Sequence, residues 1–221
     1  MRNLASKYLS PLDLERIDAA VQSAEKETSG EIVCLIQAAS YHYPMANVIG
    51  AAALALPLSL AATPLLGAWF WMGPHNMWLF ISIFAVCFTV FYLLVNYVAW
   101  LKRHFISQRE LDEEVQESAI TRFFQHGLYR TREATGVLLL ISVFERKVWV
   151  LADHGIHAKI PQQEWQSVAD TVTDGFRTKH PVESICAAVQ TIGRLLQTHF
   201  PAKQDDANEL KNVIVDKGQQ S

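Results

Sequence analysis

Charged residues are absent from a long central part of this chain. Residues 32–101, a run of 70, contain no Asp, Glu, Lys or Arg, so the 19 Lys and Arg and the 22 Asp and Glu all lie outside it. This distribution argues against a fully soluble globular protein, because such a run needs an unusually large core to bury it. A disordered chain is excluded as well, since 50% of the residues are hydrophobic.

Cysteines, an apolar leader and basic clusters are also scarce. Cys34, Cys87 and Cys186 lie far apart and form no CxxC pair, which indicates neither a disulfide framework nor a zinc site. Residues 1–29 are polar, so we expect no secretory signal peptide there. The net charge is -3 and the basic residues cluster only at 102–104, so we expect no nucleic acid partner. Walker, HExxH, GxSxG and dinucleotide motifs are missing, which leaves the common enzyme classes without support.

What fills the charge-free part is a pair of apolar runs. Residues 46–71 and 77–101 would form helices of roughly 39 and 37 Å, and both exceed the roughly 30 Å hydrocarbon core of a bilayer. Gly73 and Pro74 lie between the runs, where they break a helix and allow the chain to reverse. Tryptophans and tyrosines gather near the ends of the runs, as in the aromatic belts of membrane proteins. The sequence therefore predicts a transmembrane helical hairpin with the lipid bilayer as a partner.

Basic residues set the expected orientation of this hairpin. Lys102, Arg103 and Arg109 follow the second run, and the turn has no basic residue. By the positive-inside rule, both termini should be cytoplasmic in an integral protein of the plasma (inner) membrane with two spans. Ionisable side chains, which mark transport pathways, are missing from both runs, so we expect an anchor.

Two stripes with a four-residue repeat are expected to touch inside the hairpin. The first run carries small residues at Ala51, Ala55, Ser59, Thr63 and Gly67, and the second carries aromatic residues at Phe80, Phe84, Phe88 and Tyr92. Small residues form a groove on a helix, and an aromatic ridge can fill it.

The remaining sequence predicts a small α/β domain with a central β-sheet flanked by helices. Short apolar runs predict strands, and four-residue apolar spacing predicts helices. The expected strands are 31–37, 136–142 and 147–151, and the expected helices are 11–28, 108–127, 161–176 and 181–199. An isolated strand is unstable, so strand 31–37 must pair with the strands that follow the hairpin. We therefore expect one discontinuous domain, residues 1–40 and 105–200, interrupted by the hairpin at 46–101.

The tail, residues 201–221, is polar, and disorder is the expectation for most of it. Its short apolar run at 213–215 leaves docking on a sheet edge open.

These segments resemble the TPM domain family, which is named for a plant thylakoid phosphatase, a photosystem II repair protein and a nematode acetylcholine-receptor accessory protein. The resemblance rests on Leu9-Ser10-Pro11-Leu12-Asp13, Ser29-Gly30-Glu31-Ile32-Val33, Thr135-Gly136-Val137-Leu138-Leu139-Leu140-Ile141-Ser142, Glu145-Arg146-Lys147-Val148 and Asp153-His154-Gly155-Ile156. It covers about residues 9–40 and 105–200, and implies a central sheet with helices on both faces. Asp205-Asp206 and Asn208-Glu209-Leu210 also resemble the tail of a bacterial membrane branch of the family.

A candidate metal site follows the strand at 147–151. Asp153, His154 and His157, with Glu133 as a further candidate, could bind a divalent cation, and a turn built by Asp153 and Gly155 is the alternative. Residues 145–147 are expected to form a solvated turn. The hypothesis that follows is an accessory or scaffold module that binds another membrane protein or complex. The alternative is a divalent-metal-dependent phosphatase, which the family resemblance implies.

Overall fold

The computed structural model describes residues 9–73, 76–131, 133–202 and 210–216. The chain forms two compact units, of which the first joins Met1–Tyr41 to Asp112–Ser221 and the second is His42–Leu111. The first unit is thus discontinuous in sequence, because the residues of the second unit are inserted between its two segments.

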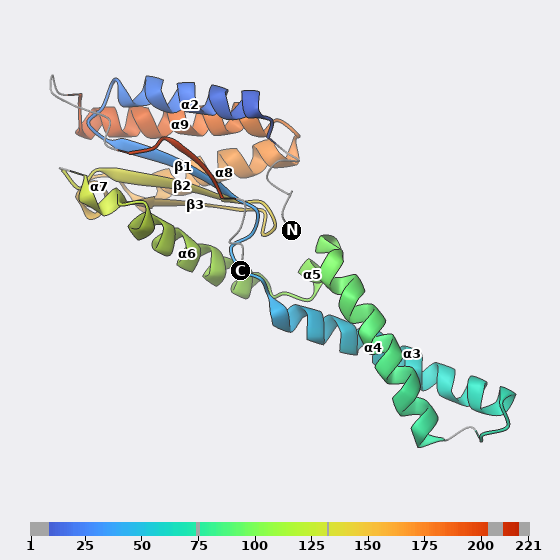
Figure 1. The fold of residues 1–221 in the computed structure, drawn as a ribbon. Helices are drawn as coiled ribbons and strands as arrows, with labels where there is room; N and C mark the ends of the chain where they lie inside the picture. The colour runs from blue at the N-terminus through green and yellow to red at the C-terminus, as the bar shows by residue number, and fades with distance from the viewer. Residues whose placement is uncertain (1–8, 74–75, 132, 203–209, 217–221) are drawn as a thin grey trace. The chain divides into compact units, whose positions relative to one another are not determined.

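A four-stranded sheet organises the first unit, in the order β3-β2-β1-β4 (Figure 1). Its strands are β1 (Glu31–Gln37), β2 (Gly136–Ser142), β3 (Lys147–Ala152) and β4 (Val213–Asp216). β1 pairs in parallel with both β2 and β4, while β2 and β3 form an antiparallel hairpin. Cys34 lies opposite Leu139 across the β1–β2 pair. The predicted pairing across the inserted segment is therefore confirmed.

Both faces of the central strands are covered, which explains why β1 and β2 are continuous apolar runs. Alternate side chains point to opposite faces of a strand. Ile32, Cys34 and Ile36 of β1 accordingly join one core cluster, while Val33 and Leu35 join another. The sheet is thus the middle layer of three.

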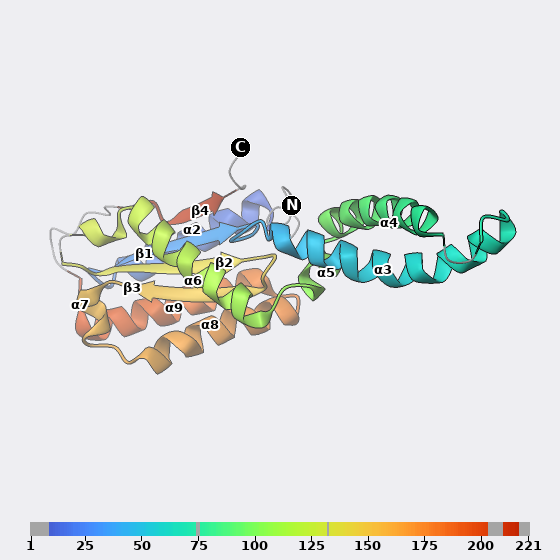
Figure 2. The ribbon, with the colours of Figure 1, turned by 90° about the horizontal axis from the view of Figure 1, so that it is seen from below.

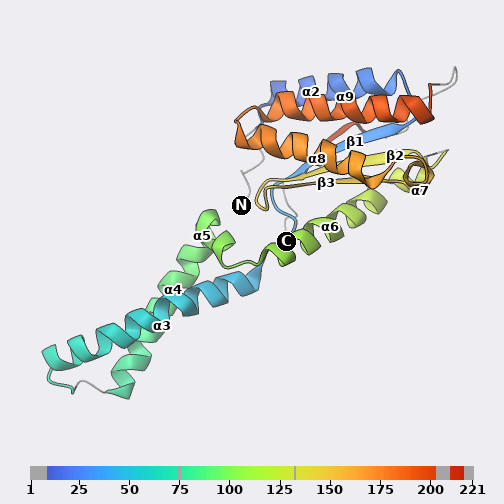
Figure 3. The same ribbon diagram turned by 180° about the vertical axis from the view of Figure 1, so that it is seen from behind.

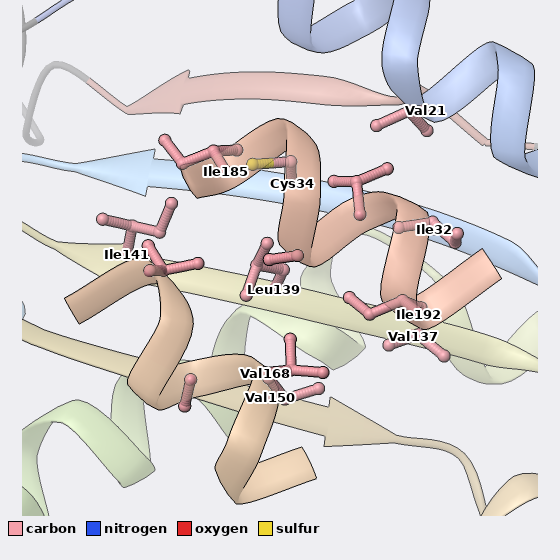
Figure 4. Close-up of a cluster of buried hydrophobic side chains, with 14 of the residues drawn as sticks. Val21, Ile32, Cys34, Val137, Leu139, Ile141, Val150, Val168, Ile185 and Ile192 are labelled. Carbon is pink, nitrogen blue, oxygen red and sulfur yellow. The ribbon is translucent and has the colours of Figure 1, made fainter. Parts of the chain in front are cut away.

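Three helices cover the first face: α2 (Pro11–Glu25), α8 (Gln162–Arg177) and α9 (Pro181–His199). The view from behind shows them together on one side of the sheet (Figure 3). Figure 4 shows Val21 of α2, Val168 of α8, and Ile185 and Ile192 of α9 over the apolar side chains of the strands. The helix α2 begins at a capping box, in which Ser10 and Asp13 bond each other's backbone N–H groups.

The opposite face is covered by α6 (Gln108–Gln125), followed by the short helix η1 (Leu128–Arg130). Figure 2 shows α6 running across the sheet on this side. Val115, Ala119 and Phe123 of α6 pack with Leu138 and Leu140 of β2. The layers agree with the predicted α/β fold, a central sheet with helices on both faces.

The C-terminal run 213–215 forms β4 and extends the sheet beyond β1. Of the two options left open by the sequence, docking on a sheet edge is therefore the one that occurs for this run. Asp216 at its end forms an ion pair with Arg122 of α6. The motif residues 205, 206, 208 and 209 lie outside the described part of the chain.

The second unit contains α3 (Pro44–Trp69), α4 (Met77–Tyr97) and α5 (Ala99–His104). Both α3 and α4 are long and apolar enough to cross a membrane by length and composition. They pack against each other, and α3 remains helical through Pro57 and Pro64. Pro74 and His75 of the predicted turn lie outside the described residues.

The helix α4 ends at Tyr97 and not at the predicted Leu101, because Val98 adopts φ -99° and ψ 94°. No glycine or proline marks this break in the sequence. After it, α5 brings Lys102 within 2.5 Å of the backbone oxygen of His42, at the start of the unit.

Candidate functional site

Asp153 lies directly after β3, at the edge of the sheet where β1 and β2 begin. Its backbone N–H donates to the Gly136 oxygen at 2.9 Å, which fixes it beside the start of β2. Its Oδ1 accepts from the backbone N–H of His154 at 2.6 Å and lies 2.9 Å from His154 Nδ1. The residue is 8% exposed, and Oδ2 has no hydrogen-bond partner among the described residues. One buried carboxylate oxygen therefore has its hydrogen-bonding capacity unused within the described part of the chain.

The two candidate histidines lie on α7 (His154–His157), for which Asp153 is the N-cap. Residues 154–157 form one short helical turn, for which Asp153 supplies the capping acceptor. Both histidines are exposed, and only His154 approaches the carboxylate.

Glu133 precedes β2 on the same edge of the sheet, and its Oε2 lies 3.4 Å from Ser29 Oγ. A Cβ added to Gly155 would lie 2.8 Å from the Ala134 oxygen and 3.0 Å from the Glu133 oxygen. The backbone of α7 therefore passes directly against the segment that carries Glu133, and only glycine fits there.

These four residues share one region, but they do not form a ready-made metal cluster. Among the described residues, no three His, Cys, Asp or Glu side chains gather as metal ligands would. Structural zinc sites have four protein ligands and catalytic ones three. A cation bound at Asp153 would therefore need water or substrate oxygens for most of its coordination.

A buried polar network occupies the opposite edge of the sheet, where β1 and β2 end. Glu145 is completely buried and accepts from the Ser40 backbone N–H at 2.9 Å and from Ser142 Oγ at 2.5 Å. Ser40 Oγ in turn donates to Ser142 Oγ at 2.9 Å. Gln37 Nε2 extends the network to Ser40 Oγ and to Ser118 Oγ of α6, at 2.8 and 3.0 Å.

The expectation of a solvated turn is therefore wrong for Glu145. The turn folds back toward the segment that follows β1, and the carboxylate accepts from one backbone N–H, of Ser40, and from one side-chain hydroxyl, of Ser142. The spacing of Ser142 and Glu145, three residues apart across a turn, is the sequence signal that could have revealed it. Arg146, by contrast, is exposed as expected.

An exposed aromatic face lies on the outer side of α6 and η1. It consists of Ile120, Phe124 and Tyr129, which are 42%, 58% and 42% exposed. The Phe124 and Tyr129 rings are 5.4 Å apart, and the Arg130 guanidinium lies 5.2 Å from the Tyr129 ring centre. Neighbouring Phe123 points the other way and is buried in the core. The face is thus held rigidly on a packed helix, and its residue types are common in binding hot spots.

In the hairpin, the small-residue stripe is buried. Ala51, Ala55, Ser59, Thr63 and Gly67 all belong to the buried side of α3. Ser59 and Thr63 satisfy their hydroxyls by donating to the backbone oxygens of Ala55 and Ser59, each at 2.7 Å. On α4, Phe84 and Phe88 are half-buried and their rings lie 5.8 Å apart. Contact between the two stripes, residue by residue, stays a prediction.

The hairpin also contains one amide pair that connects its helices. Asn47 of α3 donates from Nδ2 to Asn96 Oδ1 of α4 at 3.1 Å. Asn47 is 5% exposed, and its Oδ1 has no hydrogen-bond partner among the described residues. Asn47 lies near the start of α3 and Asn96 near the end of α4.

The sheet order and the helices on both faces define an α/β domain, and comparison with known proteins shows what this domain is similar to. Residues 104–195 match the family model described as the TPM domain. A similar solved structure is the NMR structure of BA42 protein from the psychrophilic bacterium Bizionia argentinensis. It shares 18% sequence identity over 94% of each chain, with a TM-score of 0.57, which shows likeness of fold. No curated protein matches the chain.

Proposed function

We propose that this protein is a membrane-anchored accessory or scaffold module, whose TPM domain binds another membrane protein or complex. The hairpin would anchor the domain in the plasma (inner) membrane with both termini in the cytoplasm. The aromatic face would supply the binding surface. The exposed aromatic face is the observation that carries the proposal.

The exposure of the two long helices supports membrane anchoring. Of the most apolar stretch of each, 28% in α3 and 6% in α4 is buried within the protein. A core helix of a soluble protein would bury most of such a stretch. The 26 residues of α3 and the 21 of α4 correspond to roughly 39 and 32 Å, enough to cross the hydrocarbon core. Lys102, Arg103 and Arg109, after α4, favour cytoplasmic termini.

The aromatic face supports a binding role because large apolar side chains gain free energy when a partner covers them. Phe124 and Tyr129 are neighbours, and Arg130 adds a cation beside them. Aromatic residues and arginine are enriched at protein interfaces, whereas scattered exposed leucines are normal on any surface. Leu12 of α2, 66% exposed, is such a leucine and provides a control.

A photo-crosslinking experiment tests this binding surface. The full-length protein carries a photoreactive phenylalanine derivative in place of Phe124, or of Leu12 as the control, and is irradiated in its native membrane. We expect discrete adducts with one or a few membrane proteins from position 124 and few from position 12. Replacing Tyr129 by Ser in the position-124 protein should reduce these adducts several-fold. Equal adduct patterns from positions 124 and 12 would refute the aromatic face as the binding surface.

The second candidate function is a divalent-cation-dependent phosphatase, and the free Oδ2 of buried Asp153 favours it. Purified full-length protein in detergent would be assayed for phosphate release with and without Mg²⁺, Mn²⁺ or Ca²⁺. Asp153→Asn should abolish any cation-stimulated turnover, while Asp170→Asn on the exposed side of α8 should leave it unchanged. Such a result would replace the accessory role as the leading proposal.

A further inference from the structure

The exposed side of α4 carries polar residues in a regular pattern. Ser82, Thr89 and Asn96 are seven residues apart, and all three are exposed. The half-buried residues of α4, including Phe84 and Phe88, lie on another side of the helix. Seven residues are close to two helical turns, so the three polar side chains form one line, called here the α4 seam.

We infer that the α4 seam is a self-association surface, along which α4 packs against α4 of a second copy of this protein. This inference rests on the proposed membrane anchoring. Two copies inserted in one membrane have the same orientation, so their α4 helices are parallel. A seven-residue repeat then brings identical residues together in successive layers, in the left-handed crossing of paired helices.

The chemistry of the seam fits a second copy, because an asparagine amide carries both donors and acceptors and can pair with its own symmetry mate. Ser82 and Thr89 donate to the Trp78 and Ala85 oxygens of their own helix, at 2.9 Å each. Their side chains are thus small and internally satisfied, which lets two helices approach closely.

The Asn47–Asn96 pair is an independent sign that a polar partner is missing. Asn47 Oδ1 is buried and has no donor within the described part of the chain. Asn96 uses Oδ1 to accept from Asn47, and its Nδ2 makes no bond there to any described residue. The exposed Asn96 therefore offers a second copy its Nδ2 donor. Hydrogen bonds between amide side chains stabilise helix association in membranes, because lipid tails supply no hydrogen-bond donors or acceptors.

Disulfide crosslinking in native membranes tests the seam. The full-length protein, with Cys87 and Cys186 replaced by Ala and the buried Cys34 retained, receives one new cysteine by Thr89→Cys or by Val90→Cys. Val90 is 57% exposed at the same depth of α4, about 100° around the helix, and provides the control. We expect oxidation to give covalent dimers from position 89 many times faster than from position 90. Adding Asn96→Leu should lower dimer formation at position 89 about tenfold.

Alkaline extraction of the same membranes separates this inference from the anchoring proposal. If the protein is washed out of the membrane, anchoring and the seam fall together. If it stays embedded and positions 89 and 90 crosslink equally, the seam alone is refuted. Adducts of position 89 with a different protein, without dimers, would also overturn pairing with a second copy.

Discussion

Replacing the buried Glu145 should destabilise the α/β domain far more than its place in a turn suggests. Its carboxylate accepts hydrogen bonds from Ser40 N–H and Ser142 Oγ. A buried donor without an acceptor costs about 1–3 kcal/mol, although the Ser142 hydroxyl can rotate to another partner. Glu145→Ala should therefore cost about 2–4 kcal/mol, whereas Glu145→Gln keeps one acceptor oxygen and should cost about 1 kcal/mol.

Hydrogen exchange of the full-length protein in detergent measures this loss locally. Amides of β1 and β2 that exchange through opening of the domain should exchange roughly 30 to 1,000 times faster in Glu145→Ala, since 1.4 kcal/mol corresponds to a factor of ten. Glu117→Ala on the exposed side of α6 is the matched control and should change little. Equal amide exchange rates in Glu145→Ala and Glu117→Ala would show that the polar network around Glu145 does not stabilise the sheet.

Three further substitutions test the packing of the sheet. Gly136→Ala should cost about 1–3 kcal/mol in a thermal melt, because its Cβ would lie 2.5 Å from the Leu128 oxygen; an unchanged melting temperature would contradict this close contact. Burial raises the pKa of the Cys34 thiol from 9.0 to about 12. Because the folded protein holds this proton more tightly than the unfolded chain, the contribution of Cys34 to the free energy of unfolding should be constant below pH 9.0 and fall as the pH rises toward about 12. Denaturant midpoints of the native protein should fall more steeply over that range than those of Cys34→Val, and parallel curves would refute the shift. Arg122→Ala removes the ion pair with Asp216 and should speed amide exchange in β4 several-fold relative to β3. If the amides of β4 and β3 are accelerated equally, the ion pair does not stabilise β4.

The sheet was largely predictable because its central strands are buried on both faces. That burial makes 31–37 and 136–142 continuous apolar runs, and their bounds in the structure are those predicted. Their pairing followed from the instability of a lone strand, since the sequence predicts no other strand before the hairpin. Periodic apolar residues likewise revealed α8 and α9, whose inner faces pack on the sheet.

The features that escaped prediction depend on neighbours that are distant in sequence. Glu145 looks like a surface residue beside Arg146 and Lys147, and only the return of the chain at Ser40 buries it. The break at Val98 has no helix-breaking residue, and the contact between Lys102 and His42 forms after it. At the candidate site, the sequence showed that Asp153 and His154 are adjacent, but it could not show that the His157 side chain is exposed to solvent.

The parallel pairing of β1 with β2 also constrains how the protein is made. Gln37 and Ser142, which are hydrogen-bonded across this pair, are 105 residues apart in sequence. A ribosome that adds about 5–20 residues per second needs roughly 5–20 s to produce β2 after β1 has emerged. During that interval both apolar helices, α3 and α4, leave the ribosome before the sheet can close. Throughout translation of the inserted segment, β1 is therefore an apolar strand whose partner β2 has not yet been made.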